Sequence, residues 1–196
     1  SGYRTLAAVR IGHLTEASGF ARGFDQFVDV RSKLSDRDTL ETALDFLEAS
    51  PRPGFAYVHV RACHNPFPGI ARDENLNRQL RQRFDETELV QGGIDPGNLQ
   101  FKLAVRSGAL HPVGEQVEYL HAVYESVLRR VVERMVGWTA DELGRRSLFD
   151  RTLLVVSADH GEELLDHGNY AHGHALWNEV VHVPLLAKLP RGTRSR

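Results

Sequence analysis

The chain has little cysteine, little lysine and no long apolar run, and each scarcity excludes a class of protein. Its 196 residues contain one cysteine, Cys63, which excludes an internal disulfide. Eighteen consecutive apolar residues occur nowhere, so the sequence contains no membrane-spanning helix. Lysine supplies only 3 of the 24 basic residues, the arginines are scattered and the net charge is −2, so no basic block predicts a nucleic-acid partner. The start, SGYRTLAAVR, does not have the pattern of a signal peptide, and the compartment stays undetermined.

Apolar runs of strand length alternate with helical patterns along the chain. Strands are predicted at 4–10, 55–60, 152–158 and 183–189, and the continuous run at 152–158 predicts a strand that is covered on both faces. Helices are predicted at 35–50, with Ser35 or Asp36 as the cap, at 114–136 and at 139–143. The alternation predicts an α/β fold, a three-layer sandwich around a mostly parallel central sheet.

The length predicts one domain over 1–196. Within it, the stretch 85–113 is rich in Gly, Pro and Asp and has no periodicity. Such a composition predicts a long surface excursion between the regular elements.

Metal-binding residue types concentrate at 157–174, SADHGEELLDHGNYAHGH, which holds 4 of the chain's 10 histidines. Asp159 and His160 follow a predicted strand, and at a strand end both side chains can turn toward one cation. A carboxylate and an imidazole are a common pair of ligands for Zn, Mn or Fe. The tripeptide Asp159-His160-Gly161 alone, however, is equally typical of a solvated acidic loop. His172 and His174 share one face if the segment is extended.

One segment rarely supplies every ligand of a divalent ion, so we expect two ligands here and anion contacts from the remaining histidines. Glu162, Glu163 and Asp166 are interpreted as a solvated or helix-starting acidic face. A further candidate, His64, lies in CHNPF at the end of the strand predicted at 55–60. That position suits general acid work or contact with an oxyanion, and the alternative is an exposed loop histidine.

Four segments, in order along the chain, resemble the sulfatase branch of the alkaline-phosphatase-like superfamily. They are GYRTLAAV followed by GFARGFDQFVDV, FAYVHVRACHNPF, DRTLLVVSADHGEELLDHG, and HGHALWNEVVHVPLLAKLP. The resemblance implies a partial alkaline-phosphatase-like fold. It also implies that Asp159 and His160 bind a metal and that His64 contacts the sulfate or phosphate of an ester. His174 matches a residue that contacts the substrate anion, and His172 is an additional anion or metal contact.

The resemblance also shows what this chain does not match. The family's nucleophile and first metal-binding acids precede GYRT, and nothing in the sequence corresponds to them. Cys63 does not fit the C-x-P-x-R motif of a formylglycine nucleophile, because the proline comes one residue late and the arginine is missing. We interpret Cys63 as a buried or half-buried structural thiol. Calcium is the family default, but the imidazole of His160 favours Mn or Zn.

The sequence therefore predicts metal-dependent hydrolysis of a small anionic sulfate ester, with this chain incomplete for catalysis alone. A phosphate or phosphonate ester hydrolase or transferase of the same superfamily is the first alternative. The nucleophile distinguishes the two: a Cys in C-x-P-x-R indicates the sulfate ester hydrolase, and a Ser or Thr indicates the phosphate or phosphonate enzyme. A catalytically silent fragment or a degenerate binding module is the second alternative.

Overall fold

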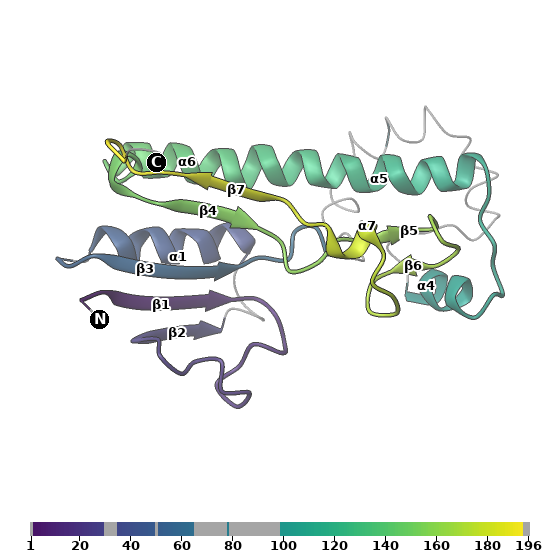
Figure 1. The fold of residues 1–196 in the computed structure, drawn as a ribbon, viewed down its shortest axis with the longest axis horizontal. Helices are drawn as coiled ribbons and strands as arrows, with labels where there is room; N and C mark the ends of the chain where they lie inside the picture. The colour runs from purple at the N-terminus through teal and green to yellow at the C-terminus, as the bar shows by residue number, and fades with distance from the viewer. Residues whose placement is uncertain (1, 30–34, 50, 65–77, 79–98, 194–196) are drawn as a thin grey trace. The chain divides into compact units, whose positions relative to one another are not determined.

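The computed structural model describes residues 2–29, 35–49, 51–64, 78 and 99–193, and their contacts divide the chain into two compact units (Figure 1). Unit 1 comprises 1–61, 133–152 and 189–196, and unit 2 comprises 62–132 and 153–188. Each unit has its own cluster of buried hydrophobic side chains. No helix in the described part of the chain is long and apolar enough to cross a membrane.

Unit 1 is built on a parallel sheet. Its strands are β1 (Arg4–Val9), β2 (Gln26–Asp29) and β3 (Gly54–His59), in the order β2-β1-β3. Helix α1 (Asp36–Glu48) packs against β1 and β3, because its apolar side carries Ala43 and Phe46 onto Leu6 of the middle strand. Helix α6 (Trp138–Arg145) and the 3-10 turn η2 (Phe149–Arg151) also belong to this unit.

Helix α1 begins with a reciprocal cap. The hydroxyl of Ser35 accepts a hydrogen bond from the Asp38 backbone N–H at 3.2 Å, and the Asp38 carboxylate accepts one from the Ser35 N–H at 2.6 Å. This capping box satisfies two backbone donors at the helix start. The hydrogen bonds from Ser35 also lower the pKa of Asp38. The predicted helix at 35–50 is therefore confirmed, with Ser35 as its cap.

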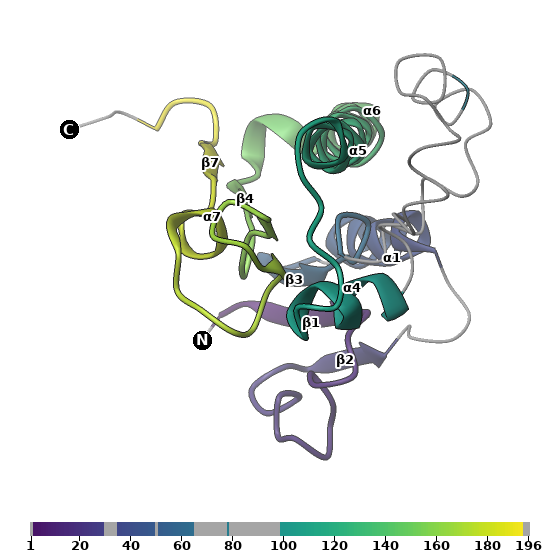
Figure 2. The same ribbon diagram turned by 90° about the vertical axis from the view of Figure 1, so that its right-hand side faces the viewer.

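Unit 2 combines helices with two antiparallel strand pairs, and Figure 2 looks along the axis of its longest helix. Its helices are α4 (Leu99–Arg106), α5 (Glu115–Val131) and α7 (Asn178–Val181). The π-helical segment η1 (Val132–Gly137) follows α5 in the chain and, apart from Val132, belongs to unit 1. Strand β4 (Leu154–Ser157) pairs with β7 (Leu185–Lys188), and β5 (Glu163–Leu164) pairs with β6 (Tyr170–Ala171). The α/β class predicted from the sequence is confirmed.

The core of unit 2 lies between α4, α5 and the β5–β6 hairpin. Its largest buried side chains include Phe101, Leu120 and Tyr170, and the rings of Phe101 and Tyr170 meet edge to face at 5.0 Å. Cys63 is half-buried and packs against this core, as the sequence predicts. The core therefore packs against the β5–β6 hairpin, which forms part of the segment 159–174.

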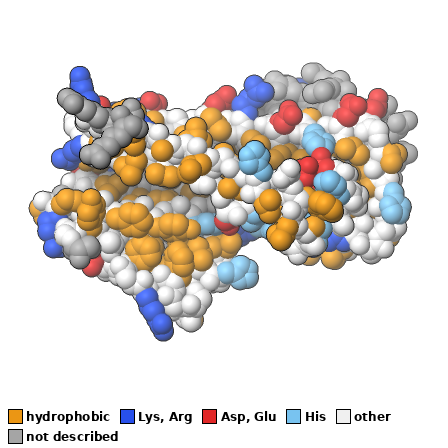
Figure 3. Space-filling view, viewed as in Figure 1, with side chains coloured by type: hydrophobic (Ala, Val, Ile, Leu, Met, Phe, Trp, Pro, Cys, Tyr) orange, Lys and Arg blue, Asp and Glu red, His pale blue; other side chains and the backbone are white. Residues whose placement is uncertain are grey.

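The structure of unit 2 differs from the sequence prediction in two places. Residues 99–106, inside the predicted excursion, form helix α4, because Phe101 and Val105 lie one turn apart and both are buried. Most of the rest of that excursion, 85–98, lies outside the described residues. Strand β4 is not covered on both faces within the described residues: Val155 is 52% exposed and Leu185 of β7 is 74% exposed. Figure 3 shows hydrophobic side chains at the molecular surface over these two strands.

Candidate functional site

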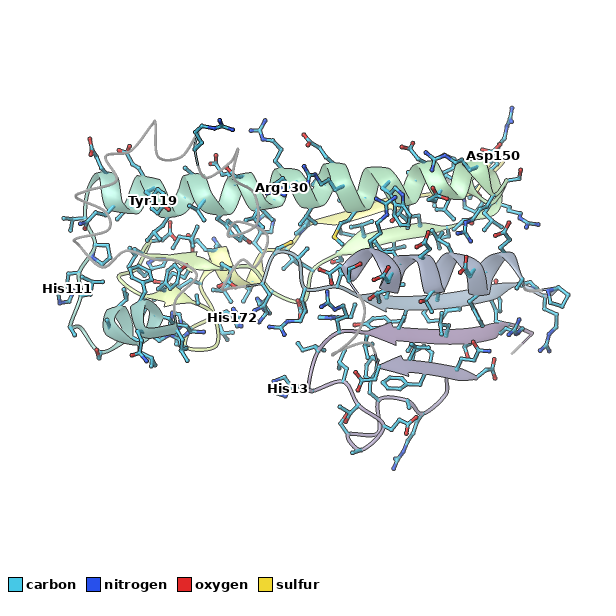
Figure 4. The ribbon with its side chains drawn as sticks, turned by 180° about the vertical axis from the view of Figure 1, so that it is seen from behind. His13, His111, Tyr119, Arg130, Asp150 and His172 are labelled. Carbon is cyan, nitrogen blue, oxygen red and sulfur yellow. The ribbon has the colours of Figure 1, made fainter. Side chains whose placement is uncertain are left out.

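Three histidines from separate segments of unit 2 converge. His64, His160 and His172 each offer a ring nitrogen, and these nitrogens lie within 4.8 Å of one another. The ring centroids of His160 and His172 are 3.8 Å apart, and that of His64 is 5.0 Å from His172 and 6.0 Å from His160. Figure 4 shows His172 beside the β5–β6 hairpin and well apart from His111. We call these three residues the histidine cluster.

A left-handed backbone residue precedes the third member of the cluster. Ala171 ends β6 with φ at 71°, is fully buried and is followed directly by His172. For a residue with a Cβ this conformation costs roughly 1–2 kcal/mol, and such strain persists where the surrounding structure enforces it. The strain at Ala171 is therefore part of how the hairpin directs His172 toward His160.

Ala171→Gly should raise the free energy of unfolding by about 1 kcal/mol, because glycine adopts a positive φ without strain. Ala122→Gly is the matched control, because Ala122 is also buried but lies within helix α5. The free energy of unfolding of this control should fall by about 1 kcal/mol, because glycine is unfavourable within a helix. Urea unfolding measures both. Equal losses in the two variants would contradict the assignment of strain to Ala171.

Hydrogen bonds fix the ring orientation of two cluster members. His160 Nδ1 lies 2.8 Å from the carbonyl oxygen of Gly161, and His172 Nδ1 lies 2.9 Å from Oε1 of Glu162. A carbonyl and a carboxylate can only accept, so each Nδ1 carries a proton, and in the neutral form of each ring Nε2 is the nitrogen with the lone pair. Within the part of the chain that the structure describes, neither Nε2 makes a hydrogen bond. Both lone pairs are therefore available to a ligand.

Asp159 lies at the border of the cluster. Its side chain is 61% exposed, and its Oδ1 accepts a hydrogen bond from the His160 backbone N–H at 3.2 Å. The same oxygen lies 4.0 Å from His160 Nε2. The predicted Asp-His pair thus presents a carboxylate oxygen and an imidazole lone pair on the same side of the strand end.

His174 has a different set of contacts. Its Nε2 lies 2.6 Å from Oε2 of Glu163, and its Nδ1 lies 3.0 Å from a guanidinium nitrogen of Arg106. The carboxylate accepts and the guanidinium donates, so both ring nitrogens of His174 are engaged. Arg106 also donates to the carbonyl oxygens of Tyr170 and His172. His174 therefore joins α4 to the segment after β6 and lies outside the histidine cluster.

The interpretation of Glu162 and Glu163 as a solvated acidic face is wrong. Glu162 is 6% exposed and Glu163 is fully buried, because each carboxylate accepts a hydrogen bond from a histidine of the same segment. Burial first, and then the negative charge of Glu162, raise the pKa of Tyr124 to about 12. Burial also lowers the pKa of Lys102, an effect that Arg106 reinforces and Glu162 opposes.

Sequence reasoning missed Glu162, Glu163 and Arg106. Two adjacent acids followed by two histidines in H-x-H were the available signal for the carboxylate–histidine pairs. For Arg106 no such signal existed, because it lies in the stretch that was interpreted as a surface excursion.

Comparison with known proteins identifies the family. The family model described as Sulfatase matches residues 2–196, almost the whole chain. The chain belongs to the sulfatase family. This confirms the resemblance inferred from the four sequence segments. Among curated proteins, none matches the chain.

Solved structures similar to this sulfatase-family chain confirm the partial alkaline-phosphatase-like fold. BT4656 in complex with its substrate D-glucosamine-2-N,6-O-disulfate has a TM-score of 0.60 at 15% identity, over 96% of this chain and 53% of that one. The phosphonate monoester hydrolase SpPMH from Silicibacter pomeroyi has a TM-score of 0.57 at 16% identity, over 96% of this chain and 51% of that one. The C-terminal periplasmic domain of EcEptC from Escherichia coli has a TM-score of 0.56 at 16% identity, over 95% of this chain and 48% of that one. The chain thus spans about half the length of each.

The donor set of the cluster fits a divalent metal. Three imidazoles within 4.8 Å, two of them with a lone pair on Nε2, are the groups that zinc and other transition metals accept. The partners of the other ring nitrogens, a backbone carbonyl and a carboxylate, are those that usually support metal-binding histidines.

Proposed function

We propose that this sulfatase-family chain supplies the cation-binding and anion-binding part of a site that hydrolyses sulfate esters with a divalent metal. The convergence of His64, His160 and His172 carries the proposal. The similarity to BT4656 supports a small anionic sulfate ester as substrate, because that protein was solved with a sulfated sugar. A similar fold is also found in a phosphonate monoester hydrolase, which supports the phosphate or phosphonate ester as the second candidate.

In this proposal Asp159 and His160 are the metal ligands. His160 offers Nε2, and Oδ1 of Asp159 lies 4.0 Å from that nitrogen, so a small movement of an exposed side chain brings both to one ion. His172 is the third ligand or an anion contact, since its ring lies 3.8 Å from that of His160 and its Nδ1 is engaged by Glu162. A bound metal would polarise the ester oxygens and activate a nucleophile.

His64 and His174 are proposed to act on the anion. His64 adjoins both other members of the cluster, and an N–H of its ring would donate to the ester oxygens as negative charge develops there. For His174 the anion contact stays a prediction, and it requires that the ring release Arg106 or Glu163.

We favour zinc or manganese as the metal. Calcium prefers six to eight oxygen ligands, whereas the cluster consists of imidazole nitrogens with one carboxylate beside it. We also propose that the chain is incomplete for catalysis alone, because Cys63 does not match the nucleophile motif and packs against the core.

Ester hydrolysis and anion binding by the purified chain test this proposal. With manganese or zinc added, the chain should bind sulfate but show no turnover of p-nitrophenyl sulfate or p-nitrophenyl phosphate. Asp159→Ala should weaken metal-dependent binding of the anion by about tenfold or more, since it removes a proposed ligand. Metal-dependent turnover that persists in Asp159→Ala would contradict the proposed site. Turnover that is lost in Asp159→Ala would support the site and refute incompleteness.

A further inference from the structure

We infer that Glu162 is a positioning residue of the histidine cluster, which holds His172 with its Nε2 lone pair toward the cluster and balances the charge of a bound cation. The inference rests on the proposed function, because it concerns the same metal site. It assigns a role to a carboxylate that the family resemblance did not single out.

The contact between Glu162 and His172 sets the tautomer of the imidazole. The Glu162 side chain is 3% exposed, and its Oε1 lies 2.9 Å from His172 Nδ1. A carboxylate can only accept, so Nδ1 carries a proton, and the tautomer of the neutral ring is the one with the lone pair on Nε2. Without this acceptor the ring is free to take the other tautomer, in which Nε2 carries the proton and cannot bind a metal.

The second carboxylate oxygen of Glu162 indicates a cation nearby. Among the described residues, Glu162 Oε2 is buried and has no hydrogen-bond partner. A buried carboxylate with a single hydrogen bond from an imidazole is costly unless positive charge lies close by. The Lys102 ammonium is one such charge, because Glu162 acts against the lowering of its pKa. A divalent ion bound to His172 would be a second, as in carboxylate–histidine–metal arrangements.

The neighbouring residue Glu163 provides an internal comparison. It also accepts from a histidine, but that histidine is His174, which lies outside the cluster. Its other oxygen accepts from the backbone N–H groups of His167 and Asn169 at 3.2 and 2.9 Å. Glu163 therefore organises the β5–β6 loop, and its removal should not change the affinity of the folded protein for a metal.

Zinc titration of the purified chain tests the inference. Glu162→Ala should weaken zinc binding about 10- to 100-fold, and Glu162→Gln about 3- to 10-fold, because glutamine still accepts from His172 but carries no charge. Glu163→Gln should bind zinc as the wild type does. Glu179→Gln is a second control, since Glu179 pairs with His167 on the surface of the same unit. Thermal unfolding establishes that each variant is folded.

A nitrogen-15 spectrum of the metal-free protein at one fixed pH reports the tautomer directly. His172 should carry its proton on Nδ1 in the wild type and in Glu162→Gln, and should show a mixture of tautomers in Glu162→Ala. A purely structural role for Glu162 would change the unfolding temperature but not this spectrum. A wild-type His172 with its proton on Nε2 would overturn the inference even if Glu162→Ala fails to fold.

His160→Ala separates the two possible failures. If the wild type and His160→Ala bind zinc equally, the proposed metal site is wrong, and with it the inference. If His160→Ala loses zinc while both Glu162 variants bind within about twofold of the wild type, the site stands and the role of Glu162 is wrong.

Discussion

Gly161→Ala is expected to lower the free energy of unfolding by about 3 kcal/mol or more. A Cβ at Gly161 would lie less than 3.0 Å from the backbone oxygen of Glu179, and a backbone atom cannot move aside as a flexible side chain does. The two segments are held at this distance by a 2.7 Å hydrogen bond from the Gly161 N–H to the Val180 carbonyl. Gly161 is not among the residues with positive φ, so a glycine is required here because the two backbones approach closely, and not for its backbone conformation.

Chemical denaturation of Gly161→Ala and Gly144→Ala tests this expectation. Gly144 lies in helix α6, and a Cβ there meets nothing within 4 Å. Gly144→Ala should therefore gain about 0.5–1 kcal/mol from the helix propensity of alanine. A loss smaller than about 1 kcal/mol in Gly161→Ala would show that the α7 segment yields easily. Gly161→Ala should also weaken zinc binding, because the Gly161 carbonyl holds His160 Nδ1.

Glu163→Ala is expected to cost about 3–5 kcal/mol of folding free energy. Glu163 is fully buried, and its carboxylate accepts hydrogen bonds from His174 Nε2 and from two backbone N–H groups of the β5–β6 loop. Removing it leaves these donors without an acceptor in a buried site, and each such donor costs about 1–3 kcal/mol.

Glu125→Ala is the matched control for Glu163→Ala. Glu125 lies on an exposed position of α5, and its removal should change stability by less than about 0.5 kcal/mol. Urea unfolding followed by circular dichroism measures both variants. Similar stability in the two variants would mean that water or another group replaces the Glu163 carboxylate.

The secondary structure of the fold was largely predictable because its signals are local. Helix α1 has a Ser35 cap and an apolar stripe, and β1 and β3 are runs of strand length. Burial was harder to predict. Val155 lies in a continuous apolar run that is typical of a covered strand, yet it is 52% exposed. Which face of a strand is covered depends on other segments, and a single run of residues carries no information about them.

The candidate site was predictable in its histidines but not in its supporting carboxylates. His64 and His160 follow strands, and strand ends are where ligands usually bind in α/β sheets. Glu162 and Glu163 are adjacent acids, and adjacent acids normally face water, so their burial depends on histidines ten and eleven residues further along the chain. The separation of His172 from His174 was equally hidden, because it results from the left-handed Gly173 between them and from the contact of His174 with Arg106 on helix α4.

Zinc-edge X-ray absorption of the zinc-loaded chain is the most direct test of the metal site formed by the histidine cluster. With wild-type protein we predict one ion per chain, with at least two imidazole nitrogens at about 2.0 Å. His160→Ala should lose imidazole scattering together with most of the bound zinc, whereas His111→Ala, which changes a histidine outside the cluster, should not. A zinc shell without imidazole, or one unchanged in His160→Ala, would contradict the metal site.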